Sequence, residues 1–135
     1  MKYLEARDVI YTVLSTVWDP QYVINWPDVP EEVPDVELAW ARATIKTDGG
    51  RQIGLSDQVG RRRFNTNGVF ILQIFSPIGD GLTLGYELAQ TVVDAYCGTH
   101  NDNLWFRNIR MKEVPGSGEF TQINVSVDFN YDDLR

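Results

Sequence analysis

The sequence from Thr121 to Tyr131 alternates between two kinds of side chain. Ile123, Val125 and Val127 fall on one side of an extended chain, and Gln, Asn, Ser and Asp residues fall between them on the other. A period of two is that of a β-strand with one buried face and one solvated face. The chain must therefore fold around a sheet. The face that carries the apolar side chains of this strand is covered, and the face that carries the polar side chains is in contact with water.

Two further segments carry apolar residues at spacings of three and four, the period of an amphipathic helix. They are residues 3–18, which end before Asp19-Pro20, and residues 82–96, which end at Cys97-Gly98. Strands are predicted at residues 37–47, 59–64, 69–76, 104–114 and 121–131. The order α-β-β-β-α-β-β predicts an α+β fold: a mostly antiparallel sheet of about five strands, with both helices packed on one face.

Three segments between these elements carry their own signals. Asn65-Thr66-Asn67-Gly68 predicts a hairpin, because Asn-Gly supplies the positive φ angles of such turns. The nearly continuous apolar run at 69–76 is expected to be buried on both faces if its strand is central. Residues 18–36 hold four prolines and predict an extended connection that packs along the body of the domain. Residues 48–58 are polar and glycine-spaced, which predicts a flexible loop.

Composition excludes several classes of function. The 135 residues suit a single domain spanning 1–135. No apolar run approaches the roughly 20 residues of a helical membrane span. One cysteine and one histidine leave no internal disulfide framework and no multi-ligand metal site, and Cys97 is expected to be a small core residue. The acidic residues form no recognisable catalytic motif, so we expect no enzyme activity, no metal and no cofactor.

The charge is distributed unevenly along the chain. The formal net charge is −7, and this acidic balance argues against a general nucleic-acid binder. Residues 1–37 carry two basic and eight acidic groups, whereas residues 38–63 carry six basic and two acidic groups. The rest of the chain is acidic again, with four basic and nine acidic groups. Such blocks are either ordinary solvated faces or complementary surfaces that meet between copies of the chain.

Arg61-Arg62-Arg63 is the most concentrated group of basic residues. It is open to three interpretations: an edge strand whose charge blocks unwanted pairing, an ion-pairing surface for a neighbouring subunit or partner protein, or a weak, salt-sensitive nucleic-acid contact. Trp26, inside the proline-rich segment, is the aromatic residue that we expect at an interface. The residues predicted to contact a subunit or partner are Trp26, Arg42, Arg51, Arg61, Arg62 and Arg63.

A series of segments in fixed order extends over nearly the whole chain. It comprises Val23–Pro27, Trp40–Ile45, Arg61-Arg62-Arg63-Phe64-x-x-x-Gly68, the strand to Pro77-x-Gly79-x-Gly81, Glu87–Tyr96 and Phe129–Tyr131. The glycine–strand–Pro-x-Gly-x-Gly–helix run is the most specific part. In this order and spacing the chain resembles the small bacteriophage tail terminator, or tail-completion, proteins of the lambda-like group and related phage families.

The resemblance implies a structural protein of the virion. Such a protein forms a ring, typically a hexamer, that caps the tail tube at its full length and joins it to the head. The implied partners are further copies of the chain, the tail tube protein and the head–tail connector protein. DNA would pass through the ring without specific binding. From the charge blocks of this chain we add the hypothesis of an acidic lumen, which would let DNA slide without sticking because like charges repel. The implied location is the tail or neck of the virion, after assembly in the bacterial cytoplasm.

Two alternatives stay open at this point. Head–tail connector and stopper proteins of the phage neck have similar sizes and also form rings. A small intracellular ligand-binding or enzymatic α+β domain belongs to a different class, and it would need a concave pocket with convergent polar groups.

Overall fold

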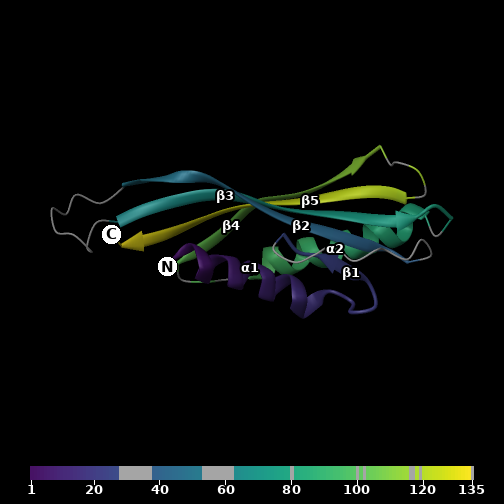
Figure 1. Ribbon diagram of the computed structural model, residues 1–135, viewed down its shortest axis with the longest axis horizontal. Helices are drawn as coiled ribbons and strands as arrows, with labels where there is room; N and C mark the ends of the chain where they lie inside the picture. The colour runs from purple at the N-terminus through teal and green to yellow at the C-terminus, as the bar shows by residue number, and fades with distance from the viewer. Residues whose placement is uncertain are drawn as a thin grey trace.

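The computed structural model describes residues 1–27, 38–52, 63–79, 81–99, 101, 103–115, 118 and 120–134. These residues form two helices and five strands (Figure 1). The helices are α1 (Tyr3–Val17) and α2 (Gly81–Gly98), and the strands are β1 (Val23–Asn25), β2 (Trp40–Gln52), β3 (Arg63–Pro77), β4 (Leu104–Val114) and β5 (Phe120–Leu134). The predicted α+β class and the element order α-β-β-β-α-β-β are confirmed.

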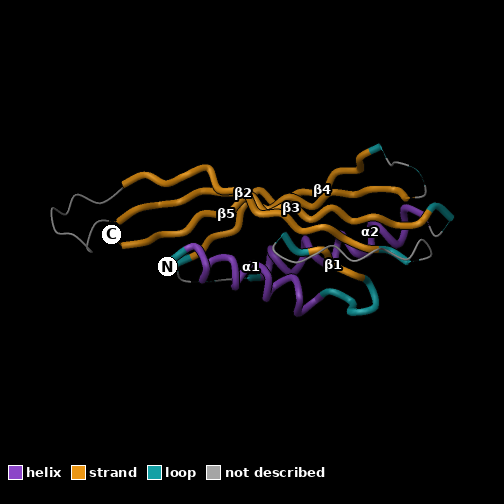
Figure 2. The backbone as a smooth tube through the Cα atoms, viewed as in Figure 1, coloured by secondary structure: helices purple, strands orange, loops and turns teal. Residues whose placement is uncertain are grey.

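The strands form one sheet in the order β1-β2-β3-β5-β4. The short edge strand β1 runs parallel to β2, and all other neighbours are antiparallel. Strand β3 lies at the centre and pairs with β5 along all of its 15 residues. Figures 1 and 2 show both helices on the same side of this sheet, as the sequence predicts.

The core lies between the helices and one face of the sheet. Ile10 of α1, Val92 and Tyr96 of α2, and Phe70 and Leu72 of β3 are fully buried there. The Tyr96 hydroxyl donates a 2.7 Å hydrogen bond to the carbonyl oxygen of Ile10, which links the two helices inside the core. Burial raises the pKa of Tyr96 far above its usual value, so the hydroxyl keeps the proton that it donates.

The hairpin prediction at Asn65–Gly68 is wrong. Strand β3 runs straight through these residues, and β2 and β5 pair with them on either side. The three strands before α2 are therefore β1, β2 and β3, not the predicted 37–47, 59–64 and 69–76. Pairing on both sides outweighs the local preference of Asn-Gly for a turn. The proline-rich segment contributes β1 and packs Tyr22, Ile24 and Trp26 against the core, while its residues 28–36 lie outside the described residues.

Gly68 serves a different purpose from the predicted turn. A Cβ atom there would lie 2.5 Å from the ring carbon Cζ of Phe129 and 2.6 Å from the carbonyl oxygen of Lys46. The ring of Phe129, on the neighbouring strand β5, therefore packs directly over the glycine backbone. Glycine inside a strand often marks such a close approach, and an aromatic neighbour restores the contacts that the missing side chain would make.

Two other predictions need correction. Residues 48–52 of the predicted flexible loop belong to β2, which is bulged between Thr47 and Gly50, where Gly49 has a φ of 85°. Residues 53–58 lie outside the described residues. Cys97 is exposed, because the preceding residue, Tyr96, takes the core-facing position in the last turn of α2.

We expect Gly68→Ala to lower the free energy of unfolding by about 1–3 kcal/mol, the usual cost of overpacking a filled site. Gly98→Ala is the matched control, because a Cβ atom at Gly98 would meet no heavy atom within 4 Å. Urea unfolding of both variants measures the difference. Equal stability of the two variants would contradict the close packing of Phe129 on Gly68.

Candidate functional site

The face of the sheet opposite the helices is covered by no described element (Figure 1). We call it the open face. Its side chains form rows across β2, β3, β5 and β4. One row is Arg42, Gln73, Asn124 and Lys112; the next is Thr44, Ile71, Ser126 and Arg110; a third is Lys46, Val69, Asp128 and Arg107. Basic residues thus stand on the two outer strands, with polar and apolar residues between them.

Charge is segregated between the two sides of the sheet. Among the described side chains, the open face carries the basic residues Arg42, Lys46, Arg63, Arg107, Arg110 and Lys112 and the acidic residues Asp48, Asp128 and Asp132. The helix side carries the basic residues Lys2 and Arg7 and the acidic residues Glu5, Asp8, Asp19, Glu87, Asp94, Glu113 and Asp133. A basic face and an acidic face therefore lie back to back.

A β-bulge in β4 arranges the basic side of the open face. Asn108 has a φ of 52°, and the register with β5 shifts between Arg107 and Arg110. In a regular strand, residues three apart point to opposite faces. The bulge instead brings Arg107 and Arg110 to the same face, together with Lys112, and we call these three residues the β4 row. Asparagine tolerates the left-handed conformation that this requires.

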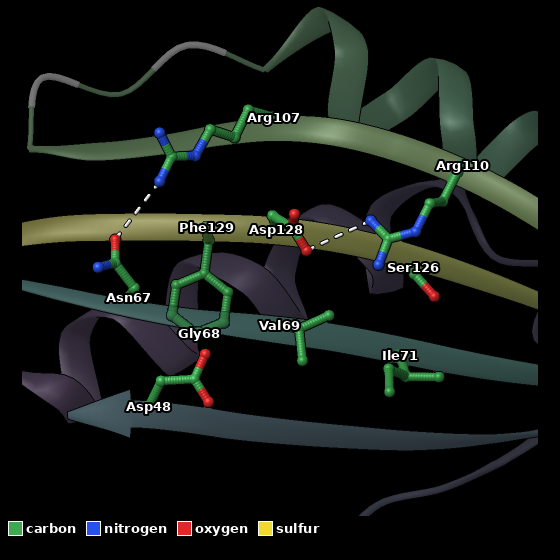
Figure 3. A pocket seen from close by; sticks show the side chains of 10 residues that line it. All are labelled: Asp48, Asn67, Gly68, Val69, Ile71, Arg107, Arg110, Ser126, Asp128 and Phe129. Atoms are coloured by element: carbon green, nitrogen blue, oxygen red, sulfur yellow. Dashed lines mark hydrogen bonds and ion pairs between the residues drawn. The ribbon is translucent and has the colours of Figure 1, made fainter.

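The centre of the open face is hollowed (Figure 3). The hollow has a volume of about 400 Å³, and Val69 and Ile71 form part of its lining. Figure 3 shows both arginines of the β4 row reaching over it from one side. Arg107 donates to Asn67 at 3.4 Å, and Arg110 donates to Asp128 at 3.3 Å.

Polar side chains at this hollow are hydrogen-bonded to one another. Asp128 also accepts a 2.9 Å hydrogen bond from the side-chain amide of Asn108. This bond and the Arg110 guanidinium hold the pKa of Asp128 below its usual range, so it is an ionised anchor for the β4 row. Within the described part of the chain, no group of His, Cys, Asp and Glu could hold a metal ion.

A second surface lies along α1. Two hollows of about 370 and 520 Å³ adjoin at Ser15, and together they form what we call the α1 groove. The residues that line it are Asp8, Tyr11, Thr12, Ser15, Thr16, Trp18, Pro20, Tyr22, Val23, Ile24 and Trp26. The groove thus has several aromatic side chains in its lining. The exposed residue Asp8 belongs to the lining as well, the exposed Glu5 lies further along α1, and the exposed Asp19 follows the end of α1.

Trp26 was predicted at an interface, and it lies in the α1 groove. Its ring centroid is 4.5 Å from that of Tyr11, and the side chain is half-buried against the core. One part of Trp26 therefore anchors the chain to α1, and the other part remains accessible. Its neighbour Trp18 is buried and donates its indole N–H to the carbonyl oxygen of Tyr22 at 2.9 Å.

The predicted arginines do not form one cluster. Arg42 lies on the open face, 5.5 Å from the ring centroid of Trp40 and opposite Gln73. Arg63 begins β3 with its side chain 60% exposed, 3.8 Å from Asp132. Because the two positions are ten residues apart in the β3 register, they are separated by about 33 Å.

The remaining predicted arginines are described less completely. Arg51 pairs with Asn65 near the Arg63 end, but its side chain lies outside the described residues. Arg61 and Arg62 also lie outside them. The β4 row was not predicted, because its residues belong to a segment with an overall acidic balance. The closely spaced bases at 107, 110 and 112 were the available signal.

The Asp128 geometry predicts how stability depends on pH. A lowered folded-state pKa stabilises the fold above the usual aspartate pKa, and that contribution is lost as the pH falls through the folded-state value. We expect Asp128→Asn to lower the free energy of unfolding at neutral pH by less than about 1 kcal/mol, since the site is partly solvated. This deficit should shrink as the pH falls from about 5 to about 2.

Urea unfolding across that pH range measures the deficit. Ser126→Ala, an uncharged change on the same strand and face, provides a control whose effect should not vary with pH. A deficit of Asp128→Asn that stays constant into acid would contradict the assignment.

Comparison with known proteins bears on the fold. The chain matches no protein family model and no curated protein. Among the solved structures that are similar, one has a TM-score of 0.60 at 16% sequence identity, and the match covers 93% of this chain and 94% of the other. At this identity the likeness shows a shared fold over nearly the full length of both chains. In the described residues, no helix is long and apolar enough to cross a membrane.

Proposed function

We propose that this protein is a structural subunit that assembles head to tail into a ring at the end of a bacteriophage tail tube. The ring ends tube growth and provides the joint to the head. The observation that carries this proposal is the segregation of charge into a basic open face and an acidic helix side. A subunit with two different, complementary surfaces suits a head-to-tail interface, which closes into a ring when the rotation permits.

The resemblance to tail terminator proteins supplies the rest of the proposal. Its most specific run, from Gly68 to Gly81, spans the central part of β3, the following turn and the start of α2. The resemblance covers elements of the fold and contains no catalytic residue, which suits a structural role. The proposed partners are further copies of the chain in a hexameric ring, the tail tube protein and the head–tail connector protein. The proposed location is the neck of the virion, with DNA passing through the ring.

Removing the protein from the phage that encodes it tests this function. We expect electron microscopy of lysates to show tails of uncontrolled length that lack heads, since nothing then ends tube growth. Wild-type protein supplied from a plasmid should restore virions with tails of normal length, and Gly98→Ala should restore them equally.

The competing outcomes are distinct. Normal tails joined to heads in the absence of the protein would overturn the proposal. Tails of normal length that accumulate beside full heads would also overturn it and would favour a connector or stopper role.

A further inference from the structure

We infer that α1 of a second copy of this chain covers the open face of the sheet in the assembled protein. The inference rests on the proposed function for the closure of such contacts into a ring, and it names the two surfaces that meet. The first surface is the open face with its β4 row. The second is the α1 groove with the acidic residues beside it.

The open face has the composition of a surface that is normally covered. Val69, Ile71 and Phe75 of the central strand β3 lie on it half-buried, opposite no described element. Continuous apolar runs of this kind are typical of strands with both faces covered. At one end, Phe75 stacks on Trp40 with ring centroids 4.3 Å apart, and Phe120 packs edge-on against Trp40 at 6.2 Å.

The charges and dimensions of the two surfaces match. Because of the bulge, the ends of the β4 row lie opposite Asp128 and Asn124, four residues apart on β5, so the row extends over about 13 Å at the rise of a strand. From Asp8 to the end of α1 at Val17 the helix extends over nine residues, or about 14 Å at the rise of a helix, and Asp19 follows just beyond that end. A neighbouring α1 laid along β4 would therefore bring acidic groups to both ends of the basic row.

Aromatic side chains strengthen the same match. Tyr11 and Trp26 line the α1 groove, and Arg7 already lies with its guanidinium 5.9 Å from the Tyr11 ring centroid. Guanidinium groups stack favourably on such rings, and Trp, Tyr and Arg dominate the binding energy of interfaces. The guanidinium groups of Arg107 and Arg110 could therefore stack on the aromatic rings of a neighbouring α1 groove.

The edges of the sheet are poorer interfaces than its open face. On β4, the bulge at Asn108 and the basic row interrupt regular pairing. On the other side, the short edge strand β1 pairs with β2 only over Trp40–Arg42, and the part of β2 beyond it carries a bulge between Thr47 and Gly50. Bulges and charges on edge strands are features that prevent pairing with another chain. Growth of the sheet from subunit to subunit is therefore disfavoured, and contact through the face is preferred.

The open face is large enough for a stable contact. Four strands at about 4.8 Å spacing and 11 residues at about 3.3 Å rise give an area of about 700 Å². A standard protein interface buries about 800 Å² on each partner. Because the open face and α1 are different surfaces of one chain, every copy that uses one of them still offers the other, and the contact repeats around a ring.

Charge reversal on each surface tests this inference. The open-face variant is Arg110→Glu with Lys112→Glu, and the groove variant is Asp8→Lys with Asp19→Lys. Each variant alone should remain monomeric, because its two surfaces then carry like charges. A 1:1 mixture should form oligomers of alternating variants, since each variant's changed surface complements the other's.

Sedimentation velocity and native mass spectrometry at matched protein concentration and low salt measure assembly, and urea unfolding checks that each variant is folded.

The control is Glu87→Lys with Asp94→Lys, on the exposed side of α2. It raises the net charge by the same amount as the groove variant. It should assemble as the wild type does. Loss of assembly in this control, assembly of either single-surface variant, or failure of the folded mixture to assemble would overturn the inference. So would a wild-type protein that stays monomeric at every concentration. Failure of the phage experiment with success of the mixture would overturn the proposed function alone.

Discussion

Two helices can cover only one face of a sheet, and this limit shapes the whole molecule. The core forms where α1 and α2 pack on the alternate residues of β3 and β5, with Phe70, Leu72 and Val125 fully buried. The other alternate residues of the same strands remain on the open face. The helix side of the sheet thus contains the core that stabilises the monomer. The open face carries half-buried apolar groups and most of the described basic residues.

Local irregularities of the strands determine which side chains lie on the open face. The bulge at Asn108 turns Arg107 and Arg110 to one face, and the hydrogen bonds of Asp128 to Asn108 and Arg110 hold that geometry. On the core side, Gly68 lets the Phe129 ring lie on the backbone, in the middle of the full-length pairing of β3 with β5. The bulge at Asn108 therefore shapes the candidate interface, and the glycine at position 68 shapes the core.

Features that depend on local periodicity were predictable from the sequence, and features that depend on pairing were not. The bounds of β4, the two helices and the one-sided burial of β5 follow from spacing alone. The hairpin at Asn65–Gly68 failed because two neighbouring strands stabilise an extended backbone there. The β4 row was missed because a bulge changes which face a residue occupies. Trp26 was placed at an accessible surface, whereas Arg42 and Arg63 proved to be far apart on the sheet.

The central claim is that the open face of one subunit is completed by α1 of the next. Electron cryomicroscopy of the assembled protein at the end of the tail tube tests it most directly. We predict a closed ring in which each α1 lies across the β4 row of its neighbour, so that every sheet is covered on both faces. Subunits whose open faces meet each other across a two-fold axis, or whose open faces remain in solvent, would contradict it.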